Sequence, residues 1–127
     1  MSGVLLDTSA VIRGAEGVSD ATGAGAISVV TLGELRAGVK LAADASVRAA
    51  RQARLAAVRA NFAPLPVDEL VADHYGDALA AAREAGRITK ATDLLILATA
   101  LATGRTLLTL DERQAGLARA LAVAVSG

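Results

Sequence analysis

The sequence predicts an α/β protein, a three-layer α/β/α sandwich built around a central parallel sheet. Short apolar runs alternate along the chain with longer amphipathic stretches, and this alternation is typical of a parallel sheet that helices cover on both faces. The connections between such strands are right-handed. The chain has 127 residues, 54% of them hydrophobic, which suits one continuous core and not two, so we expect a single domain over residues 1–127.

The N-terminal half contains two strand-to-helix boundaries. Residues 4–6 form the first apolar run, and Thr8 and Ser9 open the amphipathic stretch 10–15, which predicts a strand followed by a helix. The other elements expected here are a surface connection over residues 14–25, a β-branched buried strand over residues 26–30, a helix from Thr31 to about residue 42, and a helix over residues 44–60 with one apolar and one basic face.

The C-terminal half is expected to add three strands and three helices. Pro64 and Pro66 restrict residues 62–67 to a short or edge strand, because proline cannot donate a ladder hydrogen bond. The remaining expected elements are a helix over residues 69–85 capped by Asp68 and ended by Gly86, a buried helix over residues 93–102 opened by Thr89 or Thr92 and ended by Gly104, a strand over residues 105–110, a helix from Asp111 to about residue 120, and a strand over residues 121–125.

The composition excludes several classes of functional site. The chain has no cysteine and one histidine, which excludes a disulfide framework, thiolate metal sites and a Ser-His-Asp centre, so oxygen atoms must bind any metal. It has no apolar run of the roughly 20 residues that a membrane span needs, and its start lacks the features of a signal peptide. We therefore expect a cytoplasmic protein with no membrane partner.

Four acidic residues are predicted to share one edge of the sheet. Asp7, Glu34 and Asp111 each lie just beyond an expected strand or in the first turn of the helix after it, and Asp93 opens a helix. In an open parallel sheet, ligands bind outside the carboxyl ends of the strands where the strand order reverses. The spacing therefore indicates one acidic pocket.

Each of these acids also has a structural explanation. Asp7 and Asp111 can cap helices, Asp93 is stabilised at a helix N-terminus, and the spacing of Thr31 and Glu34 fits a capping box. However, hydroxyl residues able to cap already stand beside the acids, so four carboxylates are not needed for capping. Those hydroxyl residues are Thr8, Ser9, Thr31, Thr89 and Thr92.

A cluster of carboxylates favours a divalent cation. Neighbouring carboxylates repel one another and would take up protons unless a cation neutralised them, and ligation by oxygen alone selects Mg²⁺ or Mn²⁺. Such an ion activates water, orients a phosphate and stabilises developing charge, so the predicted chemistry is hydrolysis of a phosphodiester without a covalent nucleophile.

The same residues resemble a known family. Four segments in order are similar to the PIN-domain ribonucleases, particularly the VapC toxins, and together they span nearly the whole chain. The segments are Leu6-Asp7-Thr8-Ser9, residues 28–35 with Gly38, residues 86–88 followed by residues 92–100, and Leu107-Leu108-Thr109-Leu110-Asp111.

The resemblance implies a metal-dependent endoribonuclease that is the toxin of a type II toxin–antitoxin pair. It implies Mg²⁺ or Mn²⁺ as cofactor, RNA as substrate, a homodimer, and a small VapB-like antitoxin as partner. Asp7, Glu34 and Asp93 match the acidic positions of the family, and Asp111 is the expected fourth ligand, with Glu112 as the alternative. Thr8, Ser9 and Thr109 are candidates for orienting these ligands.

Substrate and partner surfaces are less clearly marked. The formal charge of zero means that RNA affinity must come from local basic patches or from metal–phosphate contacts, and the scarcity of aromatic residues favours a structured RNA such as tRNA. We expect the antitoxin to dock on the apolar surface of residues 35–58, at Leu41 or Leu55. The candidate basic residues are Arg13, Arg36, Lys40, Arg87 and Lys90 near the site, and Arg48, Arg51 and Arg54 along one helix.

Two other functions remain open at this level. The first is an aspartyl-phosphate protein, either a phosphatase or a receiver-like domain, since both place an aspartate at a strand end; the additional acids of those patterns are absent around Asp7. The second is a module of the same fold that binds RNA or protein without catalysis. Trapping of an acyl-phosphate would indicate the first, and failure to bind Mn²⁺ would indicate the second.

Overall fold

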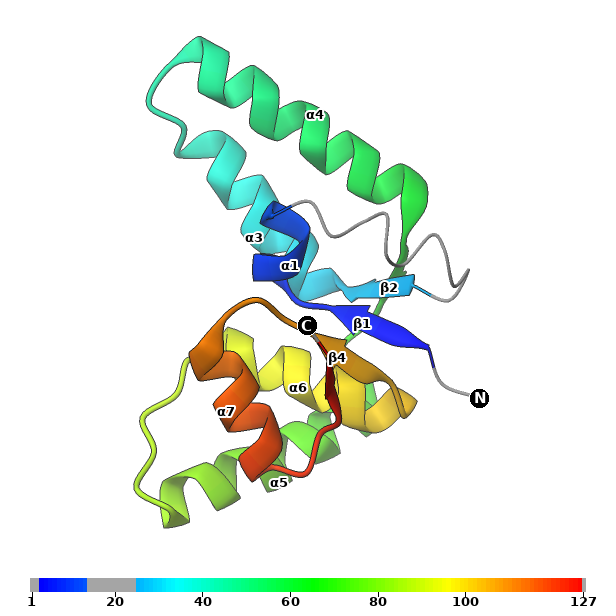
Figure 1. The fold of residues 1–127 in the computed structure, drawn as a ribbon, viewed down its shortest axis with the longest axis vertical. Helices are drawn as coiled ribbons and strands as arrows, with labels where there is room; N and C mark the ends of the chain where they lie inside the picture. The colour runs from blue at the N-terminus through cyan, green and yellow to red at the C-terminus, as the bar shows by residue number, and fades with distance from the viewer. Residues whose placement is uncertain (1–2, 14–24, 127) are drawn as a thin grey trace.

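The computed structural model describes residues 3–13 and 25–126, and its centre is a parallel sheet of five strands (Figure 1). The strand order is β3-β2-β1-β4-β5, and every neighbouring pair is parallel. Because β1 is central, the strand order reverses between β1 and β4. The strands are β1 (Val4–Leu6), β2 (Gly25–Ser28), β3 (Ala63–Leu65), β4 (Thr106–Leu108) and β5 (Val125–Ser126).

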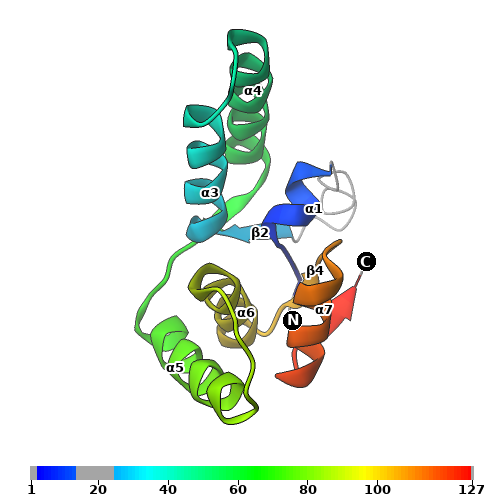
Figure 2. The ribbon, with the colours of Figure 1, turned by 90° about the vertical axis from the view of Figure 1, so that its left-hand side faces the viewer.

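Helices cover both faces of the sheet, as Figures 1 and 2 show. On one face, Leu6, Ile27 and Leu108 pack with buried residues of α1 (Thr8–Ile12), α3 (Val29–Lys40) and α4 (Ala45–Asn61). On the other face, Leu5 and Leu107 pack with buried residues of α5 (Glu69–Glu84), α6 (Ala91–Thr103) and α7 (Glu112–Ala120). The predicted three-layer α/β/α sandwich is confirmed.

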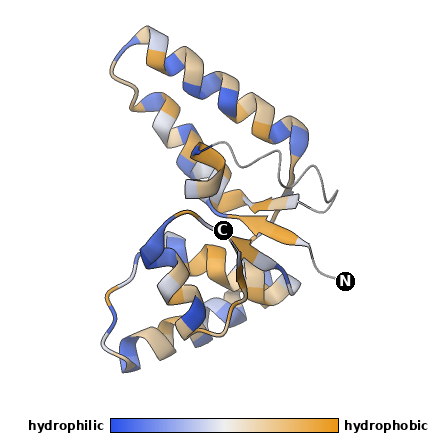
Figure 3. Ribbon diagram, in the orientation of Figure 1, coloured by the Kyte–Doolittle hydropathy of each residue, from blue (hydrophilic) through white to orange (hydrophobic). Residues whose placement is uncertain are grey.

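Helix α6 is the most deeply buried helix of the described chain. Leu94, Ile96 and Leu97 are at most 2% exposed, and Figure 3 shows this helix as predominantly hydrophobic, in contrast to the banded α4 and α5. Each such side chain contributes roughly 1.5–3 kcal/mol relative to an exposed position. The prediction of a helix that is apolar nearly all round is therefore confirmed. The described part of the chain contains no helix with the length and hydropathy needed to cross a bilayer.

The start of α3 differs from the prediction. Strand β2 ends at Ser28, and Val29 and Val30, which were predicted to be strand residues, are the first two residues of α3. The reason is the side chain of Ser28, whose Oγ accepts a hydrogen bond from the Val30 backbone N at 3.0 Å and caps the helix. A good N-cap outweighs the strand preference of two β-branched residues.

The start of α6 also differs from the prediction. Lys90 is its N-cap residue and makes no capping hydrogen bond with its side chain, so neither Thr89 nor Thr92 opens the helix. The burial of the apolar surface of α6 stabilises the helix, and packing rather than a cap determines its position.

Other boundaries agree with the sequence. Asp44 and Asp68 cap α4 and α5, and Gly86 and Gly104 follow α5 and α6 with φ angles of 68° and 65°, a left-handed conformation that favours glycine. Strand β3 is at the edge of the sheet, as its prolines predict.

The strands are shorter at some ends than predicted. Strand β4 ends at Leu108, and residues 121–124 precede the short β5 instead of belonging to it. Gly25, predicted to end a surface connection, is the first residue of β2. The rest of that predicted connection, together with the end of the first predicted helix, lies in residues 14–24, outside the described residues.

Candidate active site

The reversal of strand order brings Asp7 beside the end of β4. Asp7 directly follows β1, is 4% exposed, and donates its backbone N–H to the Leu108 carbonyl oxygen at 3.1 Å. Asp111 follows β4 by three residues and is the N-cap of α7. The two aspartates therefore flank the crevice in which open parallel sheets bind their ligands.

Asp7 is held in place through one of its two carboxylate oxygens. Oδ1 accepts hydrogen bonds from the Ser9 hydroxyl at 2.6 Å and from the Ala10 backbone N at 3.0 Å, so Asp7 is the N-cap of α1. Within residues 3–13 and 25–126, no group donates to Oδ2 of Asp7. The carboxylate can thus cap its helix and still offer the second oxygen to a ligand.

Glu34 is connected to α1 by hydroxyl groups. The Thr8 hydroxyl donates to Glu34 Oε1 at 2.5 Å, and Thr8 Oγ1 lies 3.1 Å from Thr31 Oγ1. Because α3 begins at Val29, Glu34 is its sixth residue and Thr31 its third, so the predicted capping box is wrong. The capping explanation for Glu34 is removed, and its carboxylate is instead oriented by a residue from a different element.

A second hydroxyl connection joins α1 to the end of β4. Ser9 Oγ accepts from the Leu110 backbone N at 3.1 Å and lies 3.3 Å from Thr109 Oγ1, which itself accepts from the Asp111 backbone N at 3.1 Å. Thr8 and Ser9 therefore contact acidic side chains directly, as predicted, and Thr109 contacts the backbone of Asp111.

Asp111 combines a capping role with a place near the other acids. Its Oδ1 accepts from the backbone N of Arg113 at 2.9 Å and of Gln114 at 3.4 Å, which confirms the predicted cap. Glu112, the predicted alternative, is exposed in the first turn of α7. Asp111 affects the protonation of Asp93, whereas Glu112 is not among the groups that do so. The position of Asp111 near Asp93 favours it over Glu112 as the fourth predicted ligand.

Asp93 lies in the first turn of α6, and its environment identifies its neighbours. Burial raises the pKa of this carboxyl above the ordinary value of 3.8, Lys90 lowers the pKa, the negative charges of Glu34 and Asp111 raise it, and Arg113 lowers it. Glu34 and Asp111 therefore lie close enough to Asp93 to disfavour its negative charge. Asp7 joins them through its contacts with β4 and, by way of Ser9, with Thr109.

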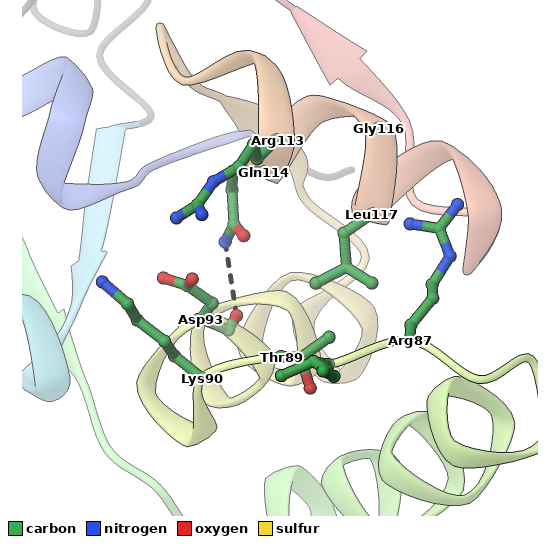
Figure 4. A pocket seen from close by; sticks show the side chains of 9 residues that line it. Arg87, Thr89, Lys90, Asp93, Arg113, Gln114, Gly116 and Leu117 are labelled. Carbon is green, nitrogen blue, oxygen red and sulfur yellow. Dashed lines mark hydrogen bonds between the residues drawn. The ribbon is translucent and has the colours of Figure 1, made fainter.

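A pocket of about 500 Å³ opens beside Asp93, between the segment before α6 and helix α7 (Figure 4). Arg87 and Lys90, both predicted near the site, contribute to its lining together with Arg113 and Gln114, which were not predicted from the sequence. Gln114 Nε2 donates to the Asp93 backbone oxygen at 3.3 Å. Arg13, also predicted near the site, lines a separate hollow of about 250 Å³ beside Asp111 and Glu112.

The family model for the PIN domain matches residues 4–120 of the chain. The chain belongs to the PIN-domain family. Among curated relatives, this PIN domain is similar to Ribonuclease VapC5 of Mycobacterium tuberculosis, with 38% identity over 100 residues that make up 79% of this chain and 73% of the relative. It is also similar to Ribonuclease VapC8 of the same species, with 40% identity over 100 residues, 76% of this chain and 88% of the relative.

Solved structures give the same family. The PIN domain superimposes on a crystal structure of VapBC-5, a member of the VapBC family of toxin–antitoxin systems from Mycobacterium tuberculosis, with a TM-score of 0.84, 35% identity and 98% of each chain covered. It superimposes on the FitAcB structure from Neisseria gonorrhoeae with a TM-score of 0.78, 30% identity, and 98% and 96% of the two chains covered. The predicted resemblance is confirmed.

The donor atoms of the acidic cluster fit a hard divalent cation. All four predicted ligands are carboxylates, and burial together with the negative charges of Glu34 and Asp111 raises the pKa of Asp93, a penalty on its charged form that a bound cation would relieve. Within the described residues, however, no three acidic or histidine side chains stand at the spacing of ligands to one ion. The four acids therefore share one neighbourhood without being assembled around a single ion site in this structure.

Proposed function

We propose that this chain is a single-domain, metal-dependent endoribonuclease that acts in the cytoplasm as the toxin of a type II toxin–antitoxin pair. The observation that carries the proposal is the gathering of Asp7, Glu34, Asp93 and Asp111, from four separate segments, around the reversal of strand order. The relatives support it, since they are named ribonucleases and the superimposable VapBC-5 structure belongs to a family of toxin–antitoxin systems.

The same four carboxylates are the proposed ligands of Mg²⁺ or Mn²⁺. When bound, such an ion supplies charge neutralisation and an activated water for attack on a phosphodiester. The hydroxyls of Thr8 and Ser9 hold Glu34 and Asp7 in fixed orientations at 2.5 Å and 2.6 Å, so fewer conformations are lost when the ligands assemble.

Two cations beside Asp93 are suited to holding the RNA backbone. Lys90 and Arg113 come from the segment before α6 and from α7, and both lower the pKa of Asp93, so their positive charges act at the acidic cluster. In Figure 4 the side chains of Lys90 and Arg113 both point toward the region of the Asp93 carboxylate, one from the segment before α6 and one from α7. A phosphate placed there is attracted by both cations while its scissile bond faces the carboxylates.

The proposed protein partners are a VapB-like antitoxin and a second copy of the chain. Of the two residues predicted for antitoxin docking, Leu55 is 2% exposed and belongs to the core, so that part of the prediction is wrong: the amphipathic pattern of α4 turns Leu55 inward. Leu41 is 79% exposed at the C-terminal end of α3 and remains the candidate contact.

The test is cleavage of total RNA and of tRNA by purified chain freed of any partner, with Mg²⁺ or Mn²⁺ compared with EDTA. Asp7→Asn and Asp93→Asn are expected to abolish the cleavage, because each removes one charged ligand while keeping the side-chain shape. Asp77→Asn, at an exposed position on α5, is the matched control and should cleave like the wild type.

The outcomes separate the alternatives. Metal-dependent cuts lost in both active-site variants support the proposed nuclease. A folded, partner-free protein that binds Mn²⁺ but leaves every RNA intact would refute the activity and indicate a module that only binds RNA or protein. A phosphoryl group trapped on Asp7 would instead indicate an aspartyl-phosphate enzyme.

A further inference from the structure

The pocket beside Asp93 extends well beyond the acidic cluster. Its volume of about 500 Å³ lies in the range typical of small-molecule sites. In Figure 4, Lys90, Arg113 and Asp93 lie at one end, Arg87 rises at the other end toward α7, and Gln114 and Leu117 project from α7 between them. The pocket therefore continues from the proposed catalytic centre without being part of its ligand set.

Gln114 gives the first sign that this pocket has a ligand. The side chain is 4% exposed, and its Nε2 donates to the Asp93 backbone oxygen at 3.3 Å, which fixes the orientation of the amide. Its Oε1 is buried and has no hydrogen-bond donor among the described residues. Burying an amide oxygen without a donor costs roughly 1–3 kcal/mol, so a ligand that shifts the pocket wall enough to bring a donor group to Oε1 would relieve this cost.

The charged residues of the pocket are the second indication that it binds a ligand. Arg87, Lys90 and Arg113 line it together with a single acid, Asp93, in a chain whose formal charge is zero. Within the described part of the chain, the guanidinium of Arg87 has no hydrogen-bond or ion-pair partner. A surplus of cations in a defined hollow attracts a phosphate group.

The apolar residues of the lining are the third indication that the pocket binds a ligand. Ile88 is fully exposed beside the pocket, and Leu117 forms part of its wall. A large aliphatic side chain left in water next to a cationic pocket favours a ligand with both an anionic and a flat apolar part.

We propose that this pocket binds the nucleotide of RNA next to the cleaved phosphodiester. Arg87 binds the phosphate of that nucleotide, Gln114 Oε1 accepts a hydrogen bond from a donor group of its nucleoside, and Ile88 and Leu117 contact its base. The proposal rests on the proposed ribonuclease function and names residues that position its substrate. It also gives a physical reason for local RNA affinity in a chain without net charge.

The side-chain amides make the proposal directly observable by NMR. The chain has three carboxamide side chains, Gln52, Asn61 and Gln114, so their N–H signals are readily assigned by substitution. The probe is each of the four nucleoside 5′-monophosphates, added in EDTA so that no cleavage occurs. We expect saturable shifts of the Gln114 amide and of the Arg87 and Ile88 backbone signals, with Gln52 on the exposed face of α4 unmoved.

Variants and simpler probes assign the contacts. Arg87→Ala is expected to weaken nucleotide binding about tenfold, equivalent to roughly 1.4 kcal/mol. Arg59→Ala removes the same charge from an exposed position in the last turn of α4 and should bind like the wild type. Inorganic phosphate and nucleosides should each bind more weakly than the monophosphates. No shift at Gln114, or equal binding by Arg87→Ala and Arg59→Ala, would overturn the proposal.

The cleavage assay keeps this inference separate from the proposed function. If the wild type cleaves RNA while Arg87→Ala and Arg59→Ala have equal KM values and nucleotides leave Gln114 unshifted, the subsite proposal fails and the nuclease stands. If nucleotides shift Gln114 but no RNA is ever cut, the pocket is supported and the nuclease fails.

Discussion

At the scale of single residues, Asp93 is in an environment that opposes its own charge. Burial and the carboxylates of Glu34 and Asp111 raise its pKa above 3.8, more than Lys90 and Arg113 lower it. The folded state therefore favours the protonated form more than the unfolded state does. Below the pKa of the unfolded state, Asp93 is protonated in both states and has no effect on stability. As the pH rises from that value through the higher pKa of the folded state, the ionisation of Asp93 lowers the free energy of unfolding.

This sign leads to a stability prediction. In EDTA at neutral pH, Asp93→Asn is expected to raise Tm, because the uncharged amide does not suffer the penalty of ionisation. The gain should shrink as the pH falls toward 3.8 and then vanish. Thermal unfolding of the wild type, of Asp93→Asn and of the exposed control Asp77→Asn across this pH range checks it. A lower Tm for Asp93→Asn at neutral pH would contradict the raised pKa of Asp93.

Thr8 provides a second prediction at this scale. Its hydroxyl donates to Glu34 Oε1 at 2.5 Å, so Thr8→Val removes the donor while nearly keeping the shape. Loss of such a positioning group typically lowers activity between about 10-fold and 100-fold. We expect a fall of this size in kcat for RNA cleavage, and rescue by Thr8→Ser, which retains the hydroxyl. Equal loss in Thr8→Val and Thr8→Ser would mean that packing of the methyl group, and not the hydrogen bond, matters.

At the scale of elements, substitutions of Asp111 at the N-terminus of α7 can separate its capping of the helix from its proposed role in catalysis. Asp111 Oδ1 accepts two backbone N–H groups, and asparagine can accept the same bonds without the charge. We expect Asp111→Asn to keep the unfolding free energy and lose cleavage activity. Asp111→Ala should lose activity and also about 0.5–2 kcal/mol of stability.

Denaturant unfolding and RNA cleavage, measured on the same preparations, check this prediction. Glu112→Gln serves as the control, because Glu112 is exposed and does not cap the helix. An Asp111→Asn variant with full activity beside an inactive Glu112→Gln variant would make Glu112 the fourth ligand.

The helix boundaries show which parts of the fold were predictable from sequence. Segments with one dominant signal were predicted closely: Asp68 and Gly86 mark the ends of α5, and Pro64 predicts the edge strand β3. The start of α3 was misplaced because two local preferences compete there, and the Ser28 cap outweighs the β-branched Val29 and Val30. A shift of a few residues in this boundary changed the interpretation of Glu34 from a capping group to a site residue.

The candidate site was predictable only in part for a related reason. Acids that follow strands can be recognised because strand ends converge in a parallel sheet, and this identified Asp7 and Asp111. Gln114 could not be found in this way, since its importance depends on a contact with the backbone of α6 and on an unpaired oxygen. Only the packing of α7 beside α6 creates both features.

At the scale of the whole molecule, the charge distribution limits how RNA can be bound. The net charge is zero, and the basic face of α4 is partly occupied: Arg51 donates to the Gly38 carbonyl oxygen at 2.7 Å and Arg48 to that of Ala42 at 3.4 Å. Arg51 thereby supplies a donor to one of the last carbonyls of α3, and Arg48 supplies one to the turn that follows the helix. Arg87, Lys90 and Arg113, by contrast, line the pocket beside Asp93 together.

This distribution predicts a shallow dependence of RNA binding on salt. Three contacting cations, Arg87, Lys90 and Arg113, correspond to a slope of log K against log salt of about −2 for a single strand, since each contact contributes about −0.7. Fluorescence anisotropy of a labelled single-stranded RNA in EDTA, between about 50 and 200 mM salt, measures this slope. Arg87→Ala should reduce its magnitude by about 0.7, and Arg59→Ala should leave it unchanged. A slope steeper than about −4 would require more than five cations and would assign RNA binding to the arginine face of α4 as well.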